Sequence, residues 1–180
     1  MTRRIATRRS PIHGNGVFAV RDIPAGVTLI EYRGRVITQA QADRRYDGTT
    51  DTGHTFLFIL NEDYVIDANH DGNAARWINH SCDPNCEAVI HEHASKRRLD
   101  RVLIESVRPI RSGEEITYDY GIVLDERYTP ALKRVWACRC GKSNCTGTLL
   151  KPKPKPKPKP KPKPKPKPKP KPKRARRSAA

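Results

Sequence analysis

The stretch Arg76-Trp-Ile-Asn-His-Ser-Cys-Asp-Pro-Asn-Cys86 sets an amide, an imidazole and two thiols within eleven residues. The ring of Pro84 fixes its own φ and pushes Asp83 out of the helical region, so a helix cannot run through the stretch. Its polar groups must therefore meet partners from elsewhere in the chain. A polar loop between two elements is the simpler interpretation, and cysteines near the end of the folded part argue against it.

Those cysteines lie in Cys138-Arg-Cys-Gly-Lys-Ser-Asn-Cys145. Cys138 and Cys140 are too close for a Cys-x-x-Cys knuckle, but a curled loop can present both thiolates, with Cys145 following. Three local ligands leave a fourth position, for which Cys82 is the natural candidate and Cys86 the rival. Four thiolates select Zn²⁺ and form a closed, structural site. The alternative is free thiols in a small loop.

The last thirty residues are unlike the rest of the chain. Lys and Pro alternate strictly over 151–172, and the whole segment 151–180 carries twelve Lys, three Arg and no acid. It contributes +15 of the formal net charge of +17, which leaves +2 for residues 1–150. About 150 residues suit one domain with its own core.

This Lys-Pro tail is expected to be disordered in the sense of having no helix or sheet, because every second residue lacks an N–H. A polyproline II rod at ~3.1 Å per residue would extend roughly 70 Å. Its charge fits nucleic-acid phosphate through counterion release, or acidic protein or lipid surfaces. A solubilising tail is the plain alternative, and its lysines are a further candidate as substrates of the chain itself.

No apolar run is long enough to cross a membrane, and no apolar segment follows the basic N-terminus. Clustered cysteines without an export signal favour metal ligands over disulfides. The sequence predicts a cytoplasmic, nucleoid- or chromatin-associated protein, with delivery to another cell left open, and we expect a monomer.

Short apolar runs separated by turn residues predict a mostly β fold with few short helices. The expected strands cover 27–32, 54–60, 64–68, 86–91 and 101–107, followed by the segment 114–121. Thr38 and Gln41 form a capping box for a short helix over 39–46, and a second short helix is expected over 73–78. A polar loop is expected at 47–53.

Taken together, ordered blocks of the chain from about residue 5 to residue 150 resemble the SET-domain protein-lysine methyltransferases with a post-SET zinc loop. The blocks are His13-Gly-Asn-Gly-Val-Phe-Ala19, Glu31-Tyr-Arg-Gly34, Ile66-Asp-Ala68, Gly72-Asn73, the stretch 76–85, Gly113-Glu-Glu-Ile-Thr-Tyr-Asp-Tyr-Gly121 and the cysteine loop 138–145. All of them in this order form a highly specific pattern.

The resemblance implies small β-sheets with a knot-like C-terminal crossing, in which 114–121 threads beside 76–86. It divides the chain into a SET domain over 1–122, a post-SET zinc-binding segment over 123–150 and the tail over 151–180. It implies S-adenosylmethionine and zinc as cofactors.

The resemblance also implies the roles of individual residues. The cofactor-binding residues are His13, Gly14, Asn15, Gly16, Asn79 and His80. The zinc ligands are Cys82, Cys138, Cys140 and Cys145, which decides against Cys86. Tyr120 is the catalytic tyrosine, and Tyr118 and Tyr32 line the lysine channel.

Methyl transfer from a sulfonium to an amine needs a neutral amine, whereas free lysine has a pKa of about 10.4. A narrow aromatic channel disfavours the ammonium form, tolerates a cationic product and lets hydroxyls align the amine. Tyr118 and Tyr120 lie two residues apart, so an extended strand directs both to one side. The hydroxyl of Tyr118 fills room in the channel, which favours mono- or dimethylation.

The sequence thus predicts methyl transfer to the ε-amine of lysine on a protein, such as a histone or another basic, DNA-associated protein. The alternatives are a DNA- or chromatin-binding module with a non-catalytic SET-like domain, and methylation of a non-histone partner. The 151–180 tail is expected to bind nucleic acid.

Overall fold

The computed structural model describes residues 3–46 and 55–153. The expected loop at 47–53 and almost all of the Lys-Pro tail lie outside the described residues. Three small sheets make up the described fold. They have the strand orders β1 (Ile5–Arg9)–β2 (Asn15–Ala19)–β10 (Glu115–Tyr118)–β7 (Asn79–His80), β3 (Thr28–Tyr32)–β9 (Arg101–Ser106)–β8 (Cys86–His91) and β4 (Arg35–Thr38)–β6 (Tyr64–Asp67)–β5 (Leu57–Ile59). The expectation of a mostly β fold is confirmed.

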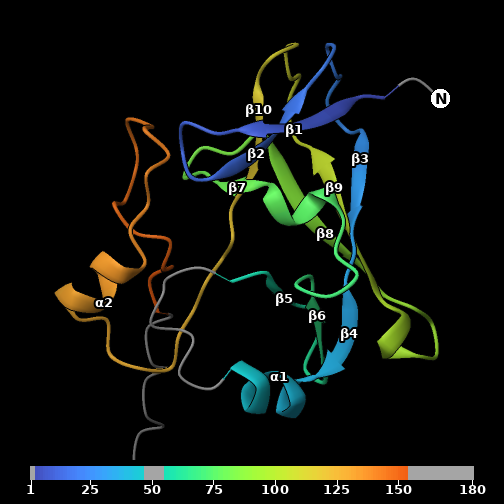
Figure 1. The fold of residues 1–180 in the computed structure, drawn as a ribbon, viewed down its shortest axis with the longest axis vertical. Coiled ribbons are helices and arrows are strands. Elements are labelled where there is room, and N and C mark those ends of the chain that lie inside the picture. The colour runs from blue at the N-terminus through green and yellow to red at the C-terminus, as the bar shows by residue number, and fades with distance from the viewer. Residues whose placement is uncertain (1–2, 47–54, 154–180) are drawn as a thin grey trace, which may run out of the picture.

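The helices are few and short, as expected. They are α1 (Gln39–Tyr46), α2 (Pro130–Val135) and the 3₁₀ turns Ala74–Trp77 and Arg97–Leu99. Figure 1 shows the four-stranded sheet at one end of the molecule and β4–β6–β5 with α1 at the other, while the C-terminal segment with α2 lies alongside.

Alternating side chains of the strands form one main core between the sheets. β9 buries Val102, Ile104 and Ser106 and turns the residues between them outward, as its alternating sequence dictates. Val17 and Ala19 of β2 are fully buried in the same core, and Ile116 of β10 joins them. The edges of this core carry the residues of the candidate site.

The crossing expected between 114–121 and 76–86 is confirmed in the strand pairing. β10 lies between β2 and β7, and it pairs with β7 in parallel, with Thr117 opposite Asn79 and Tyr118 opposite His80. The stretch 76–86 is therefore not wholly a loop, because it contributes a two-residue strand after the 3₁₀ turn. Two segments that lie far apart in the sequence meet at this pair.

Local signals in the sequence account for several elements. The capping box is confirmed, because Thr38 N–H donates to Gln41 Oε1 at 2.9 Å and Gln41 N–H donates to Thr38 Oγ1 at 3.2 Å. α2 was not expected, although Thr129 and Pro130 are a good N-cap and first residue. Thr129 Oγ1 accepts a hydrogen bond of 3.1 Å from Leu132 N–H. β1 and β4 were also not expected.

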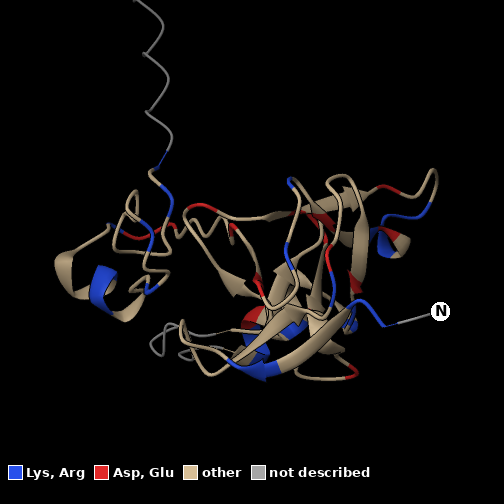
Figure 2. Cartoon of the chain, turned by 90° about the horizontal axis from the view of Figure 1, so that it is seen from above, with Lys and Arg blue, Asp and Glu red and all other residues tan. Residues whose placement is uncertain are grey.

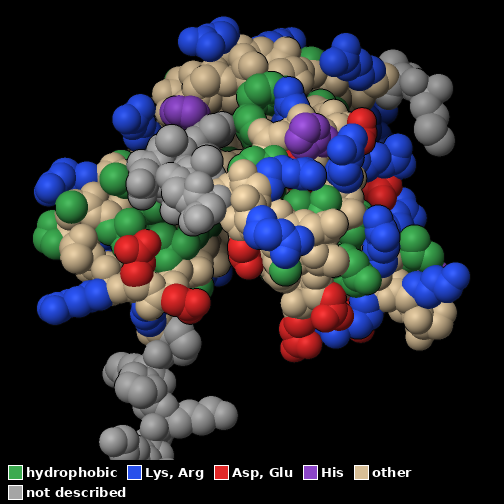
Figure 3. Space-filling model, turned by 60° about the horizontal axis from the view of Figure 1, so that its bottom comes forward, with side chains coloured by type: hydrophobic (Ala, Val, Ile, Leu, Met, Phe, Trp, Pro, Cys, Tyr) green, Lys and Arg blue, Asp and Glu red, His purple; other side chains and the backbone are tan. Residues whose placement is uncertain are grey.

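Charged residues of both signs are interspersed over the described elements (Figure 2). On the face shown in Figure 3, basic side chains are spread widely and acidic ones lie among them in smaller groups. This mixed distribution agrees with the small net charge of residues 1–150. No helix in the described ranges is long and apolar enough to cross a membrane.

Candidate functional site

A cavity of about 140 Å³ lies between the N-terminal part of the chain and the C-terminal segment. Its walls come from the turn at 12–13, from β7, from Tyr120 and Ile122 after β10, and from residues 134–139 with Leu149. The bridge between Ile122 and Leu150 holds the C-terminal segment against the residues that follow β10. Distant segments thus enclose one cavity.

Asn79 contributes a fixed amide to this cavity. Its Nδ2 lies 3.2 Å from His13 O, 3.0 Å from Asn15 O and 2.8 Å from Glu115 Oε1. All three partners are acceptors, so the NH₂ group faces them and Oδ1 faces away. The orientation of this amide follows from its hydrogen bonds.

His80 is the second β7 residue that lines the cavity. Burial lowers the pKa of His80 below its usual value, and Asp119, at 3.7 Å from Nδ1, offsets this only partly. The edge of its ring faces Tyr120, with 5.4 Å between ring centroids. His80 thus lies between Asn79, the other β7 residue of the cavity, and the aromatic ring of Tyr120.

The three tyrosines expected from the sequence come together with Phe58. The rings of Tyr118 and Tyr120 lie 5.0 Å apart, Phe58 lies 6.4 Å from Tyr118, and Tyr32 lies 5.2 Å from Phe58. Burial raises the pKa of each tyrosine well above its usual range. All three hydroxyls are therefore neutral near pH 7.

Hydrogen bonds hold two of these hydroxyls. Tyr120 donates to Ile78 O at 2.8 Å, and Tyr32 donates to Phe56 O at 3.2 Å. Because Tyr120 also lines the cavity, it belongs to both the cavity and the aromatic cluster. The two halves of the candidate site meet at this residue.

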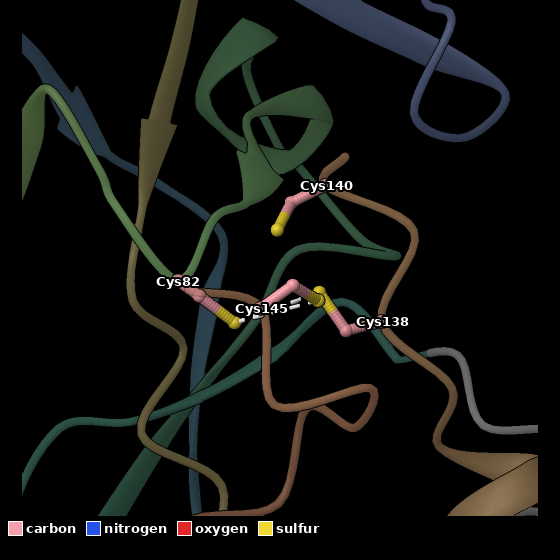
Figure 4. A group of neighbouring side chains, drawn as sticks. All are labelled: Cys82, Cys138, Cys140 and Cys145. Carbon is pink, nitrogen blue, oxygen red and sulfur yellow. Dashed lines mark hydrogen bonds between the residues drawn. The ribbon is translucent and has the colours of Figure 1, made fainter. Parts of the chain in front are cut away.

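The sulfur atoms of Cys82, Cys138, Cys140 and Cys145 all lie within 4.8 Å of one another. Figure 4 shows Cys82 reaching the C-terminal loop from the end of β7. Its Sγ lies 3.8 Å from that of Cys138 and 3.9 Å from that of Cys145. A tetrahedral ion with metal–sulfur bonds of ~2.3 Å would separate its sulfur ligands by about 3.8 Å. The group could therefore hold a metal ion.

Cys86, the rival of Cys82, lies outside this group. It is 1% exposed and packs in the main core. Burial raises the pKa of the Cys86 thiol to about 12. The structure gives Cys86 a packing role.

Not every residue expected at the cofactor site lines the cavity. His13, Asn79 and His80 do so, whereas Gly14 in the same turn and Asn15 and Gly16 at the start of β2 do not line the cavity. Gly14 has a φ of +48°, which glycine adopts easily, so its role in this turn is one of backbone geometry.

Sequence reasoning missed several polar residues of this region. Arg134, Trp136 and Arg139 line the cavity, and Glu115 supports Asn79. Arg134 lies in α2, and Trp136 and Arg139 come shortly after it. The helix signal Thr129-Pro130 could have indicated this element. Nothing in the sequence alone distinguishes Glu115 from Glu114.

The donors and acceptors of this cavity suit a polar ligand. Within the described ranges, Trp136 Nε1 is the one buried side-chain nitrogen or oxygen without a hydrogen-bond partner. A buried donor left unpaired costs roughly 1–3 kcal/mol, so such groups commonly mark the place of a missing partner. The arginines add positive charge that suits a carboxylate. The cavity residues thus fit a ligand with an acidic group, a basic group and an aromatic part.

Comparisons with known proteins agree with this architecture. A family model described as "SET domain" matches residues 14–121. The chain is 40% identical over 139 residues to "Histone-lysine N-methyltransferase, H3 lysine-4 specific" of Mycosarcoma maydis, which covers 76% of this chain and 9% of the relative. It is 40% identical over 143 residues to "Histone-lysine N-methyltransferase SETD1B" of Homo sapiens, with 78% and 7% covered. The chain therefore spans less than a tenth of the length of these relatives.

Proposed function

Since the chain belongs to the SET-domain family, we propose that it transfers a methyl group from S-adenosylmethionine to the ε-amine of a lysine on a protein. The observation that carries the proposal is the position of Tyr120. Its ring lines the polar cavity and also lies 5.0 Å from Tyr118 in the aromatic cluster. A donor in the cavity and an amine among the tyrosines would meet beside it.

Asn79 and His80 would hold the cofactor at β7, with His13 beside them, since its carbonyl accepts from Asn79 Nδ2 at 3.2 Å. Asn79 Oδ1 suits an ammonium group, and Arg134 or Arg139 suits a carboxylate. Trp136 Nε1 has no other partner among the described residues. When bound, S-adenosylmethionine supplies an electrophilic methyl group on a positive sulfur.

The aromatic cluster would prepare the lysine for attack. Buried aromatic walls disfavour the ammonium form, so the ε-amine loses its proton to water before transfer. The neutral hydroxyls of Tyr32 and Tyr120 have their protons engaged by backbone carbonyls, which leaves oxygen lone pairs free for the amine. Tyr120 would align the amine, and alignment alone can supply ~7–11 kcal/mol in the best cases.

The proposed substrate is a histone or another basic, DNA-associated protein. The support for this class is the similarity to proteins named as histone-lysine methyltransferases. The same similarity supports a nuclear or chromatin-associated location.

We also propose Zn²⁺ as the ion held by Cys82, Cys138, Cys140 and Cys145. Four thiolates within 4.8 Å of one another suit zinc, and such sites are closed and structural. The ion would join the end of β7 to the segment 123–150, which carries one wall of the cavity. Zinc would thereby complete the cofactor site without taking part in the transfer.

The experiment that tests the proposed activity uses the purified full chain with S-adenosylmethionine and core histones. Mass spectrometry should find methyl-lysine on the added protein, and calorimetry should detect binding of S-adenosylhomocysteine. Cofactor binding without any methyl-lysine product on a range of basic proteins would instead favour a non-catalytic, chromatin-binding module. Failure to bind the cofactor would exclude the proposal.

A further inference from the structure

We infer that Glu115 is a positioning residue, whose carboxylate orients the Asn79 amide for the amino-acid end of the cofactor. The inference rests on the proposed function, because it assigns Asn79 to the cofactor. Glu115 itself does not line the cavity and acts through its neighbours.

The hydrogen bonds of Asn79 give the first reason. An amide NH₂ has two hydrogens, and Asn79 Nδ2 has three acceptors within 3.2 Å. The shortest of these contacts, at 2.8 Å, is the one to Glu115 Oε1. Hydrogen bonds to an ionised group are about twice as strong as those between neutral groups. The carboxylate is therefore the strongest of the three acceptors that hold the amide.

The same carboxylate also holds the turn that supplies the other two acceptors. Ser10 Oγ donates to Glu115 at 2.8 and 2.9 Å from the two carboxylate oxygens. Ser10 Oγ in turn accepts from Ile12 N–H at 2.9 Å. The carbonyl of His13 follows in this turn, and that of Asn15 belongs to the first residue of β2. One side chain of β10 thus ties this turn and the start of β2 to β7.

The space for this carboxylate depends on Gly16. A Cβ at Gly16 would lie 2.2 Å from Glu115 Oε1, 2.9 Å from its Cδ and 2.9 Å from Ser10 Cβ. Any side chain at residue 16 would therefore displace the carboxylate or the turn. This gives Gly16 an indirect role, because it leaves room for the group that orients Asn79.

The chemical consequence concerns one end of the cofactor. With its NH₂ held by Glu115, Asn79 presents Oδ1, an acceptor for an ammonium group, and the nearby negative charge polarises the amide further. Loss of the carboxylate removes the strongest acceptor of the amide and releases Ser10, which holds the turn that supplies the His13 carbonyl, so that the amide can rotate and present a donor instead. Binding of the amino-acid end should weaken, whereas binding of the nucleoside end should not.

The test compares two ligands on the purified full chain by calorimetry. S-adenosylhomocysteine contains the ammonium group, and 5′-methylthioadenosine lacks the amino-acid end. In Glu115→Ala, we expect the Kd of S-adenosylhomocysteine to rise about ten-fold or more and that of 5′-methylthioadenosine to change less than about two-fold. Glu115→Gln retains an oxygen acceptor but not the charge, so it should restore part of the affinity lost in Glu115→Ala.

A matched control is Glu87→Ala, which removes an exposed carboxylate from strand β8. It should leave both affinities unchanged. In steady-state assays, Glu115→Ala should raise the KM for S-adenosylmethionine while kcat at saturating cofactor stays within about three-fold. If Glu115→Ala fails to fold, Gly16→Ala should show the same ligand selectivity with the carboxylate displaced.

Several results would overturn the inference. Unchanged S-adenosylhomocysteine affinity in Glu115→Ala would contradict the role of Glu115. An equal loss of affinity for both ligands, or failure of Glu115→Gln to restore any binding, would contradict it as well. These outcomes differ from failure of the proposed function, in which the wild-type chain would bind neither ligand.

Discussion

The backbone N–H of Tyr120 donates a hydrogen bond of 3.1 Å to Nδ1 of His80. Nδ1 is thus an acceptor, and the proton of the neutral imidazole lies on Nε2. The bond joins the segment after β10 to β7, beyond the last pair of their parallel ladder. It fixes the Tyr120 backbone beside the residues proposed to hold the cofactor.

We expect Tyr120→Phe to lower kcat about 100-fold and to leave the Kd of S-adenosylhomocysteine within about two-fold. The substitution keeps the ring packed against Tyr118 and removes only the hydroxyl that Ile78 O orients. Transfer of labelled methyl groups to an added histone peptide measures the effect. Tyr64→Phe is the matched control, because Tyr64 packs against the core away from the cavity. Equal label in Tyr120→Phe and wild type would show that the hydroxyl takes no part.

Tyr118→Phe should increase the number of methyl groups added per lysine. The Tyr118 ring is buried and lies 6.4 Å from that of Phe58 and 5.0 Å from that of Tyr120, so its hydroxyl occupies space within the aromatic cluster. Removing this hydroxyl would leave room for a bulkier methylated amine.

Mass spectrometry of a peptide substrate measures the product distribution for this variant. Mainly mono- and dimethyl-lysine is expected from wild type, with a shift to higher states in Tyr118→Phe. Mainly trimethyl-lysine from wild type would reject the prediction.

Local sequence signals predicted those elements that depend on local interactions. The capping box of Thr38 and Gln41 fixed the bounds of α1 at Gln39–Tyr46, and the hairpin of β8 and β9 was expected within one residue. β1 was not expected, because Ile5–Arg9 is an edge strand in which two half-buried residues are followed by three exposed ones, so the pattern does not alternate. β4 was also not expected. It begins directly after Gly34, which is needed because a Cβ there would lie 2.6 Å from Asp67 O, and this close approach to β6 depends on a residue far away in the sequence.

The candidate site shows the same division between local and distant interactions. The resemblance could indicate Asn79, His80 and Tyr120, because they lie in continuous motifs. It could not indicate Trp136, which lies outside these motifs, or the role of Glu115, which lies inside one but depends on contacts with residues far away in the sequence. Ser10 and Glu115, for example, are separated by 105 positions.

Zinc analysis should find one ion per chain, lost in Cys82→Ser and retained in Cys86→Ser. The first substitution removes a sulfur from the group of four, whereas the second changes a buried core thiol. Elemental analysis of the purified variants measures the zinc content.

Chelation of the zinc should lower the melting temperature and weaken binding of S-adenosylhomocysteine together, because the ion joins the cavity wall to β7. Equal zinc content in Cys82→Ser and wild type would contradict the assignment.

Asp67→Asn should lower the free energy of unfolding by about 2 kcal/mol at pH 7. Asp67 Oδ2 is fully buried and accepts hydrogen bonds from Tyr46 Oη at 2.8 Å and Arg45 Nη1 at 3.0 Å, which attach α1 to β6. Burial alone would raise the pKa of Asp67, but hydrogen bonds from Tyr46, Asn69 and Arg45 outweigh it and hold the pKa below its usual value.

The pH dependence of this effect has a definite sign. A lowered pKa means that the unfolded chain binds a proton more readily than the folded one. Asp67 therefore stabilises the fold above the unfolded pKa of about 3.9, and this contribution is lost as pH falls through the lower folded pKa. Denaturant unfolding between pH 3 and 7 should show a flatter acid limb in Asp67→Asn than in wild type. Asp43→Asn, at an exposed position of the same helix, should match the wild-type curve.

Removal of residues 154–180 should weaken binding to duplex DNA and reduce its dependence on salt. These residues carry ten Lys, three Arg and no acid, whereas residues 1–150 have a net charge of only +2. Each phosphate neutralised contributes about −0.9 to the slope of log K against log salt concentration, so the slope should become shallower by several. Fluorescence anisotropy of labelled DNA at salt concentrations from about 50 to about 200 mM measures this slope.

A full-length variant with Gln at the ten lysines and three arginines beyond residue 153 separates charge from length, and it should behave like the truncated chain. Both variants should keep their activity on a short histone peptide within about two-fold, because the cavity and the tyrosines lie within 12–149. Methyl-lysine on the chain itself, seen in wild type and lost in both variants, would identify the tail as a substrate as well. Unchanged DNA affinity in both variants would leave the tail without a role in nucleic-acid binding.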